Sequence, residues 1–111
     1  MQFDNTHIYR RALELVDLSK EVLDQLPYGY GFLADQLRRA TTSIPLNFCE
    51  GYGKGTLKDQ QRFYDMARGS TCEVAAILDA GYHLGVVAQT HQENGRELCD
   101  HLARMLSRFR R

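Results

Sequence analysis

Apolar and polar residues alternate with the period of an α-helix along the segment Gln36-Leu-Arg-Arg-Ala-Thr-Thr-Ser-Ile-Pro-Leu-Asn-Phe-Cys-Glu-Gly51. At about 100° per residue, one helical face carries Leu33, Leu37, Ala40, Ile44 and Phe48. A polar stripe beside it carries Gln36, Arg39, Ser43, Asn47 and Glu50. We predict a helix from about Phe32 to about Tyr52 that buries the apolar stripe. Pro45 lies inside it and cannot bond to the carbonyl of Thr41, so we expect this helix to be kinked.

A second apolar stripe precedes this segment and a third follows it. The upstream positions that recur with helical period are Ile8, Ala12, Leu15, Ser19, Val22 and Leu26. That helix ends at Pro27, which cannot continue it, and at the glycine-containing turn that follows. Downstream, Thr56 followed by Asp59 predicts the N-terminal cap of a third helix. Its stripe consists of Phe63, Ala67, Ser70, Val74, Ile77, Gly81 and Leu84.

The last helix is predicted from a capping box and a fourth stripe. Thr90 and Glu93 have the Thr-x-x-Glu spacing that starts a helix. The apolar positions that follow are Leu98, Leu102, Met105 and Phe109. Four helical stripes joined by short connections predict an all-α fold, an antiparallel up-down-up-down four-helix bundle. We expect residues 1–111 to form a single four-helix-bundle domain.

The composition is that of an ordinary small globular protein. Of 111 residues, 43% are hydrophobic, and 14 basic residues balance 14 acidic ones. The formal net charge of zero supplies no overall field toward nucleic acid or anionic lipid, so any such binding must be local. No apolar run approaches the length of about 20 residues that spans a bilayer, and the N-terminus does not resemble a signal peptide. We expect a cytoplasmic protein that does not bind membranes. Its three cysteines lack a CxxC spacing, which predicts reduced, buried thiols.

Three separated motifs suggest a family. They are Gln36-Leu-Arg-Arg-Ala40, Ser43-Ile-Pro-x-Asn47-x-x-Glu-Gly51 and Gly69-Ser70-x-x-Glu73. In order and spacing the chain resembles the bacterial four-helix-bundle family named for proteins encoded in intervening sequences of 23S rRNA genes. The resemblance implies assembly as a homopentamer. It also implies a similarity in architecture to the accessory proteins of diversity-generating retroelements, which bind a reverse transcriptase and nucleic acid. It does not imply an enzyme.

The polar stripe has two interpretations. In the first, Arg39 pairs with Glu73 and the remaining members bond to one another, which makes a structural polar network of Arg39, Ser43, Asn47, Glu50, Ser70 and Glu73. In the second, the same groups form a surface that faces another subunit or a ligand. The sequence leaves both interpretations open.

Catalytic, metal and nucleotide sites find little support in the sequence. The glycine-rich turn Gly51-Tyr-Gly-Lys-Gly-Thr56 lacks the Lys-Ser/Thr pair and the preceding strand of a P-loop. We interpret it as a plain turn between helices, with weak anion contact through Lys54 and Lys58 as the alternative. No two of the four histidines are spaced i, i+4 as zinc ligands often are: His7, His83, His91 and His101. Asp79 with His83, and Glu97 with His101, have the spacing of ordinary helical ion pairs. We predict no catalytic residue, no metal and no cofactor.

Basic residues gather locally despite the neutral total. They are Arg10 and Arg11 in the first helix and Arg104, Arg108, Arg110 and Arg111 near the C-terminus. One interpretation is that these cations interact favourably with the helix dipole at its C-terminus. The other is that they contact phosphates, and an oligomer would carry several copies of such a weak site and so bind more tightly. We therefore expect a non-enzymatic, homo-oligomeric scaffold or adaptor whose main partner is itself. The alternative is an RNA- or DNA-binding accessory protein that uses its basic helix ends.

Overall fold

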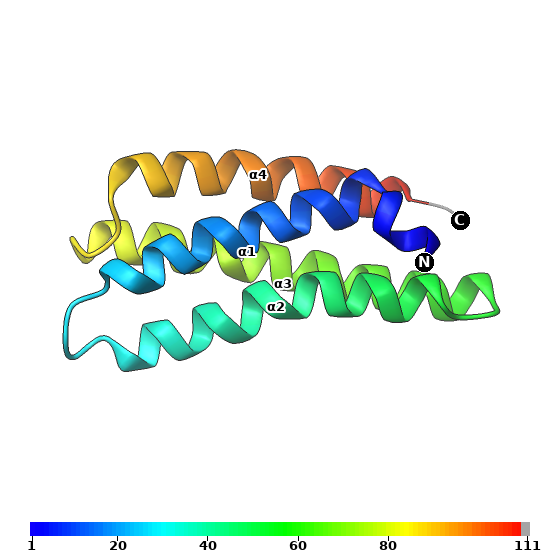
Figure 1. Cartoon of the computed structure of the whole chain (residues 1–111), viewed down its shortest axis with the longest axis horizontal. Helices are drawn as coiled ribbons and strands as arrows, with labels where there is room; N and C mark the ends of the chain where they lie inside the picture. The colour runs from blue at the N-terminus through cyan, green and yellow to red at the C-terminus, as the bar shows by residue number, and fades with distance from the viewer. Residues whose placement is uncertain (110–111) are drawn as a thin grey trace.

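A computed structural model of the chain describes residues 1–109. A short 3-10 helix, η1 (Gln2–Asn5), is followed by α1 (His7–Gln25), α2 (Gly31–Tyr52), α3 (Leu57–His83) and α4 (Gln89–Arg108). These residues contain no strand. Consecutive helices lie side by side and run in opposite directions (Figure 1). The predicted all-α, four-helix architecture is confirmed.

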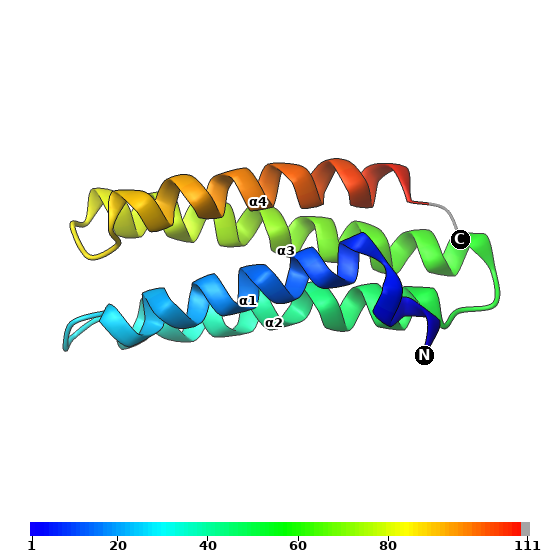
Figure 2. The same ribbon diagram turned by 45° about the horizontal axis from the view of Figure 1, so that its top comes forward.

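The helices form an elongated bundle of 44 × 22 × 21 Å. Each helix packs on the next one along the chain, and α1 packs on α4 to close the bundle. The N-terminus, the α2–α3 turn and the C-terminal end of α4 lie at one end of the molecule, and the other two turns lie at the opposite end (Figures 1 and 2). Within the described part of the chain, no helix has both the length and the apolar character needed to cross a membrane.

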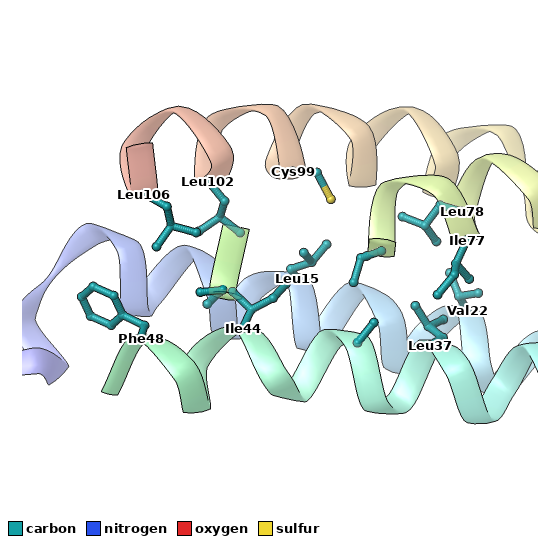
Figure 3. Close-up of a cluster of buried hydrophobic side chains, with 14 of the residues drawn as sticks. Leu15, Val22, Leu37, Ile44, Phe48, Ile77, Leu78, Cys99, Leu102 and Leu106 are labelled. Carbon is teal, nitrogen blue, oxygen red and sulfur yellow. The ribbon is translucent and has the colours of Figure 1, made fainter. Parts of the chain in front are cut away.

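All four helices contribute apolar side chains to one core (Figure 3). The side chains that the first, second and fourth stripes place at its centre, Leu15, Ile44 and Leu102, have no exposed surface. Ile77 of α3 belongs to the same cluster and is 7% exposed. Removing these surfaces from water is the main stabilising contribution that the sequence pattern predicts.

The predicted stripe of α3 is partly wrong. Its buried face is centred on Tyr64 and Thr71, whereas the expected members Phe63 and Ser70 are only half-buried. Leu84 lies beyond the last helical residue and is 53% exposed. Since α3 packs against both α2 and α4, its buried face is wide, and a stripe chosen by steps of three and four can be displaced by one position, or about 100°.

The start of α3 agrees with the sequence, but the start of α4 does not. The hydroxyl of Thr56 accepts the N–H of Asp59 at 3.2 Å, so the predicted cap is confirmed. The helix α4 begins one residue before Thr90, with Ala88 as its N-cap residue, and the capping box predicted at Thr90 and Glu93 is therefore wrong. Glu93 instead accepts a side-chain hydrogen bond from Gln89 at 2.9 Å.

The turn before α4 explains this early start. Gly85 follows the end of α3 and adopts a positive φ of 80°, a conformation that favours glycine and stops the helix from continuing. The N–H groups of Val86 and Val87 then donate to the carbonyl of Gly81, at 3.0 and 3.1 Å. Because Val87 is also buried, the chain direction is already fixed when it reaches Ala88, and the helix starts immediately.

The helix α2 continues through Pro45, which is buried within it. One turn earlier, the hydroxyl of Thr42 donates to the carbonyl of Arg38 at 2.8 Å. Hydroxyl groups that bond back along a helix often accompany a bend. The kink expected at Pro45 remains a prediction.

Candidate functional site

Three members of the polar stripe meet between α2 and α3. The hydroxyl groups of Ser43 and Ser70 form a short hydrogen bond with each other. The side-chain amide of Asn47 donates to the carbonyl of Ser43 at 2.9 Å and to its hydroxyl at 3.3 Å. All three residues are half-buried, so these bonds satisfy polar groups that water reaches only in part.

The charged members of the stripe do not join this network. Arg39 forms an ion pair with Asp35 of its own helix, at 3.1 Å from Nη2 to Oδ2, and the expected pair with Glu73 is not formed. Glu50 pairs with Lys54 of the turn that follows α2, at 3.2 Å. Arg39 and Glu73 are exposed, and side chains in water gain little from holding one geometry across two helices.

The surface around the network is open. We call it the α2–α3 face, and it comprises Arg39, Ser43 and Asn47 of α2 with Met66, Gly69, Ser70 and Glu73 of α3. Leu46 of α2 lies at its edge, where it also borders Met1 and Phe3. Leu46 is 67% exposed and Met66 is 47% exposed. A Cβ atom added at Gly69 would meet nothing within 4 Å. The face therefore combines exposed apolar side chains with an exposed glycine in the interior of a helix.

The glycine-rich turn between α2 and α3 is occupied by contacts of its own. Besides its pair with Glu50, the ammonium of Lys54 lies 5.2 Å from the centre of the Phe63 ring. The side-chain amide of Gln60 donates to the carbonyl of Lys54 at 2.9 Å. Lys58 is exposed at the start of α3. The ammonium group that would have contacted an anion is thus already engaged.

Four of the predicted basic residues, Arg10, Arg11, Arg104 and Arg108, lie at the end of the bundle where α1 starts and α4 ends (Figure 1). Arg10 donates to the carbonyl of Asn5 at 3.0 Å, and Arg11 pairs with Glu14 at 2.7 Å. Arg104 and Arg108 are exposed on the last turns of α4. The remaining predicted pair, Arg110 and Arg111, lies outside the described residues.

One basic residue that the sequence reasoning missed is Arg68 of α3. It lies with Arg104 and Arg108 around a surface hollow of about 420 Å³ between α3 and α4. The rest of its lining consists of Asp100, Ala103 and Ser107. Arg68 belongs to no motif, and only the register of α3 against α4 brings it beside the other two arginines.

That register is marked by a polar contact between α3 and α4. A guanidinium nitrogen of Arg96 lies 2.6 Å from a carboxylate oxygen of Asp79, and the side-chain amide of Gln92 donates to the other oxygen at 2.7 Å. Asp79 is therefore paired across the helices, not with His83 as its spacing indicated. An antiparallel pair of helices joined at residues 79 and 96 brings residue 68 opposite residue 107.

The three cysteines are free thiols in different environments. Cys99 is buried, and this burial, assisted by Asp100, raises the pKa of its thiol to about 12. Cys49 is half-buried, and burial likewise raises its thiol pKa. Cys72 is exposed, contrary to the expectation of buried thiols. Among residues 1–109, no group of three His, Cys, Asp or Glu side chains could hold a metal ion.

Comparisons with known proteins agree with the fold. The model of the 23S rRNA-intervening sequence protein family matches residues 4–108. A crystal structure of a protein with unknown function from the S23 ribosomal protein family of Bacteroides thetaiotaomicron is similar, with a TM-score of 0.76 and 18% sequence identity over 89% of this chain and 94% of that one. No curated protein matches the chain. Neither the family description nor the name of that structure specifies an enzymatic activity.

Proposed function

The chain belongs to the 23S rRNA-intervening sequence protein family, as its motifs predicted, and from this membership we propose that it is a non-enzymatic scaffold or adaptor that assembles as a homopentamer in the cytoplasm. The number of subunits follows from the resemblance of its motifs, and the surface that joins them is the α2–α3 face. A second copy of the chain is the occupant of that face.

Gly69 is the observation that carries the proposal. A glycine inside a helix costs about 1 kcal/mol relative to alanine. Nothing in the described chain lies close enough to Gly69 to exclude a side chain at this position. Close approach of a neighbouring subunit would explain the glycine, because two helices approach most closely where one lacks a side chain. Ala76 and Ala80 are also small and exposed, and they follow Gly69 at helical spacing on α3.

The chemistry of the α2–α3 face also suits self-association. Leu46 and Met66 offer apolar surface that a second copy would remove from water. The carboxylate of Glu73 has no ion pair within residues 1–109, while Arg39 of the same face carries the opposite charge and is 74% exposed. A neighbouring copy could therefore supply a partner for Glu73, and a formal net charge of zero opposes assembly little.

Native mass spectrometry of the full chain tests the assembly. We expect a species of five times the 12.7 kDa chain mass. The Gly69→Gln variant should dissociate toward the monomer, because the new side chain would clash with the neighbouring subunit. The matched control is Gly31→Gln, at an exposed glycine of the first turn of α2 that also has nothing within 4 Å. A wild-type monomer, or equal dissociation of both variants, contradicts the proposal.

The second candidate function is an accessory protein that binds RNA or DNA. The observation that favours it is the gathering of basic residues from the start of α1, the α2–α3 turn and the end of α4 at one end of the bundle (Figure 1). A labelled RNA or DNA should bind in a salt-dependent manner, and replacing Arg104, Arg108, Arg110 and Arg111 by Ala should abolish that binding. Absence of binding at low salt would remove this candidate.

A further inference from the structure

Most basic side chains of the described residues have a partner within the chain. Ion pairs, hydrogen bonds or ring contacts engage Arg10, Arg11, Lys20, Arg39, Lys54, Arg62 and Arg96. Within residues 1–109, the basic side chains without such a contact are Arg38, Lys58, Arg68, Arg104 and Arg108. Three of these five line the same hollow between α3 and α4. Three arginines without a partner in the described chain therefore lie together at one place on the surface.

The charges around this hollow leave an excess of positive charge. Asp100 is its one acidic lining residue, against the guanidinium groups of Arg68, Arg104 and Arg108. The hydroxyl of Ser107 donates to the carbonyl of Ala103 at 2.9 Å, so it is already bonded within α4. Like charges held close together repel one another, so an anion that enters the hollow relieves an unfavourable arrangement.

The neighbouring hollow between α1 and α4 provides a contrast. It shares Arg104 and adds Arg11 and His101, but it also contains Glu14 and Glu97. Arg11 already pairs with Glu14 there. Its charges are therefore balanced, whereas those of the hollow between α3 and α4 are not.

We propose that Arg68, Arg104 and Arg108 form a binding site for a phosphate group between α3 and α4. Guanidinium groups donate two parallel hydrogen bonds to phosphate oxygens, and three of them from two helices can surround one phosphate. The hollow of about 420 Å³ is open to solvent-borne ligands and large enough for such a group. A nucleic-acid strand and a free polyphosphate both carry such a phosphate, and the same chemistry recognises it in either.

This inference deepens the second candidate function, on which it rests if the phosphate belongs to a nucleic acid. It goes beyond that candidate in two respects. It assigns a role to Arg68, which is distant in sequence from the basic helix ends. It also confines the contact to one side of α4, so that Arg10, Arg11 and Lys54 are not required.

Binding of two probes to the full chain tests the site: a short labelled single-stranded RNA followed by fluorescence anisotropy, and inorganic tripolyphosphate followed by calorimetry. The Arg68→Gln/Arg104→Gln variant should weaken binding about tenfold or more, since it removes two charge-assisted contacts. For RNA, the slope of log K against log salt should become shallower by about 0.7, because the site contacts one phosphate. The matched control, Lys20→Gln/Arg38→Gln, removes the same charge elsewhere and should change binding less than about twofold.

A variant of opposite sign completes the test. Asp100→Asn removes the acidic member of the hollow and should tighten the binding of either probe by about two- to fivefold. All the substituted residues are exposed, so the variants should retain the helical circular dichroism of the parent.

The outcomes separate the site from the candidate function. Tripolyphosphate binding that depends on Arg68 and Arg104, without RNA binding, supports the site and removes the nucleic-acid function. RNA binding that is unchanged in the Arg68→Gln/Arg104→Gln variant overturns the site and leaves the nucleic-acid function standing. An equal loss in the control variant overturns the site, because it would reflect net charge alone. Failure of the parent chain to bind either probe overturns it as well.

Discussion

A methyl group of Val87 lies so close to Gly81 that a Cβ atom at residue 81 would overlap it, and the Val87 N–H donates to the Gly81 carbonyl at 3.1 Å. Glycine at position 81 thus lets the α3–α4 connection pack directly on α3. We predict that Gly81→Ala lowers the free energy of unfolding by about 1–3 kcal/mol, because the β-branched Val87 cannot move aside easily. Urea denaturation followed by circular dichroism measures the change.

Gly31→Ala serves as the control for this prediction. An added Cβ at position 31 meets nothing within 4 Å, and the expected change is within about 0.5 kcal/mol. An equal loss of stability in both variants would mean that the contact between residues 81 and 87 is not what requires glycine.

The hydroxyl pair of Ser43 and Ser70 should be energetically coupled. Removing either hydroxyl leaves its half-buried partner without this bond, whereas removing both leaves no hydroxyl of the pair unbonded. A double-mutant cycle with Ser43→Ala, Ser70→Ala and the double variant should give a coupling free energy of about 0.5–1.5 kcal/mol. Additive single effects would show that the bond contributes nothing to the packing of α2 on α3.

The Asp79–Arg96 pair should contribute more to stability than the Arg39–Asp35 pair. Its side chains are 36% and 43% exposed, and Gln92 also holds the carboxylate. We expect Arg96→Ala to lower the free energy of unfolding by about 1 kcal/mol and Arg39→Ala to change it by less than about 0.5 kcal/mol. Chemical denaturation of both variants at low and moderate salt provides the comparison. Equal effects would contradict a specific clamp between α3 and α4.

The three thiols should differ in reactivity. Because the thiolate is the reactive form, a buried thiol with a pKa of about 12 reacts slowly at mildly alkaline pH. We predict that iodoacetamide alkylates the exposed Cys72 first and leaves Cys99 unmodified in the folded protein. Peptide mass spectrometry gives the order, and unfolding in guanidinium chloride should equalise the three rates. Early modification of Cys99 would contradict the packing of α4.

The raised thiol pKa of Cys99 also predicts a dependence of stability on pH. The unfolded thiol loses its proton near the ordinary pKa of 9.0, whereas the folded thiol retains it to about 12. Between these values the unfolded state binds fewer protons, so the free energy of unfolding falls as pH rises. Cys99→Ala should reduce this fall, and Cys72→Ala should not. Equal pH dependence in both variants would exclude the thiol of Cys99 as the cause.

The positions of α1 and α2 could be predicted because their patterns are local. Stripes centred on Leu15 and Ile44 repeat at helical spacing, and Pro27 gives a clear end to α1. The choice between Phe63 and Tyr64 in α3 could not be made in this way. It depends on which sides of α3 are covered by α2 and by α4, and the spacing of apolar residues along α3 does not contain that information.

The hollow around Arg68 could not be predicted for a related reason. It requires the register between α3 and α4, which is set by contacts between residues that are distant in sequence, such as Asp79 with Arg96. The packing of Leu78 against Gly95 contributes to the same register, because a Cβ at position 95 would overlap a Leu78 methyl group. The hydroxyl pair was easier to anticipate, since Ser43 and Ser70 both belong to polar motifs on adjacent helices.

The order in which the helices pack has a consequence for folding speed. Each helix lies against the one that follows it, so most pairings join segments that are close in sequence, and only the contact of α1 with α4 brings the two ends of the chain together. Such a topology has low contact order and a small loop-closure cost, which is typical of proteins that fold in microseconds to milliseconds. Because the α2–α3 hairpin packs most extensively, we expect it to form the folding nucleus and α1 to dock late.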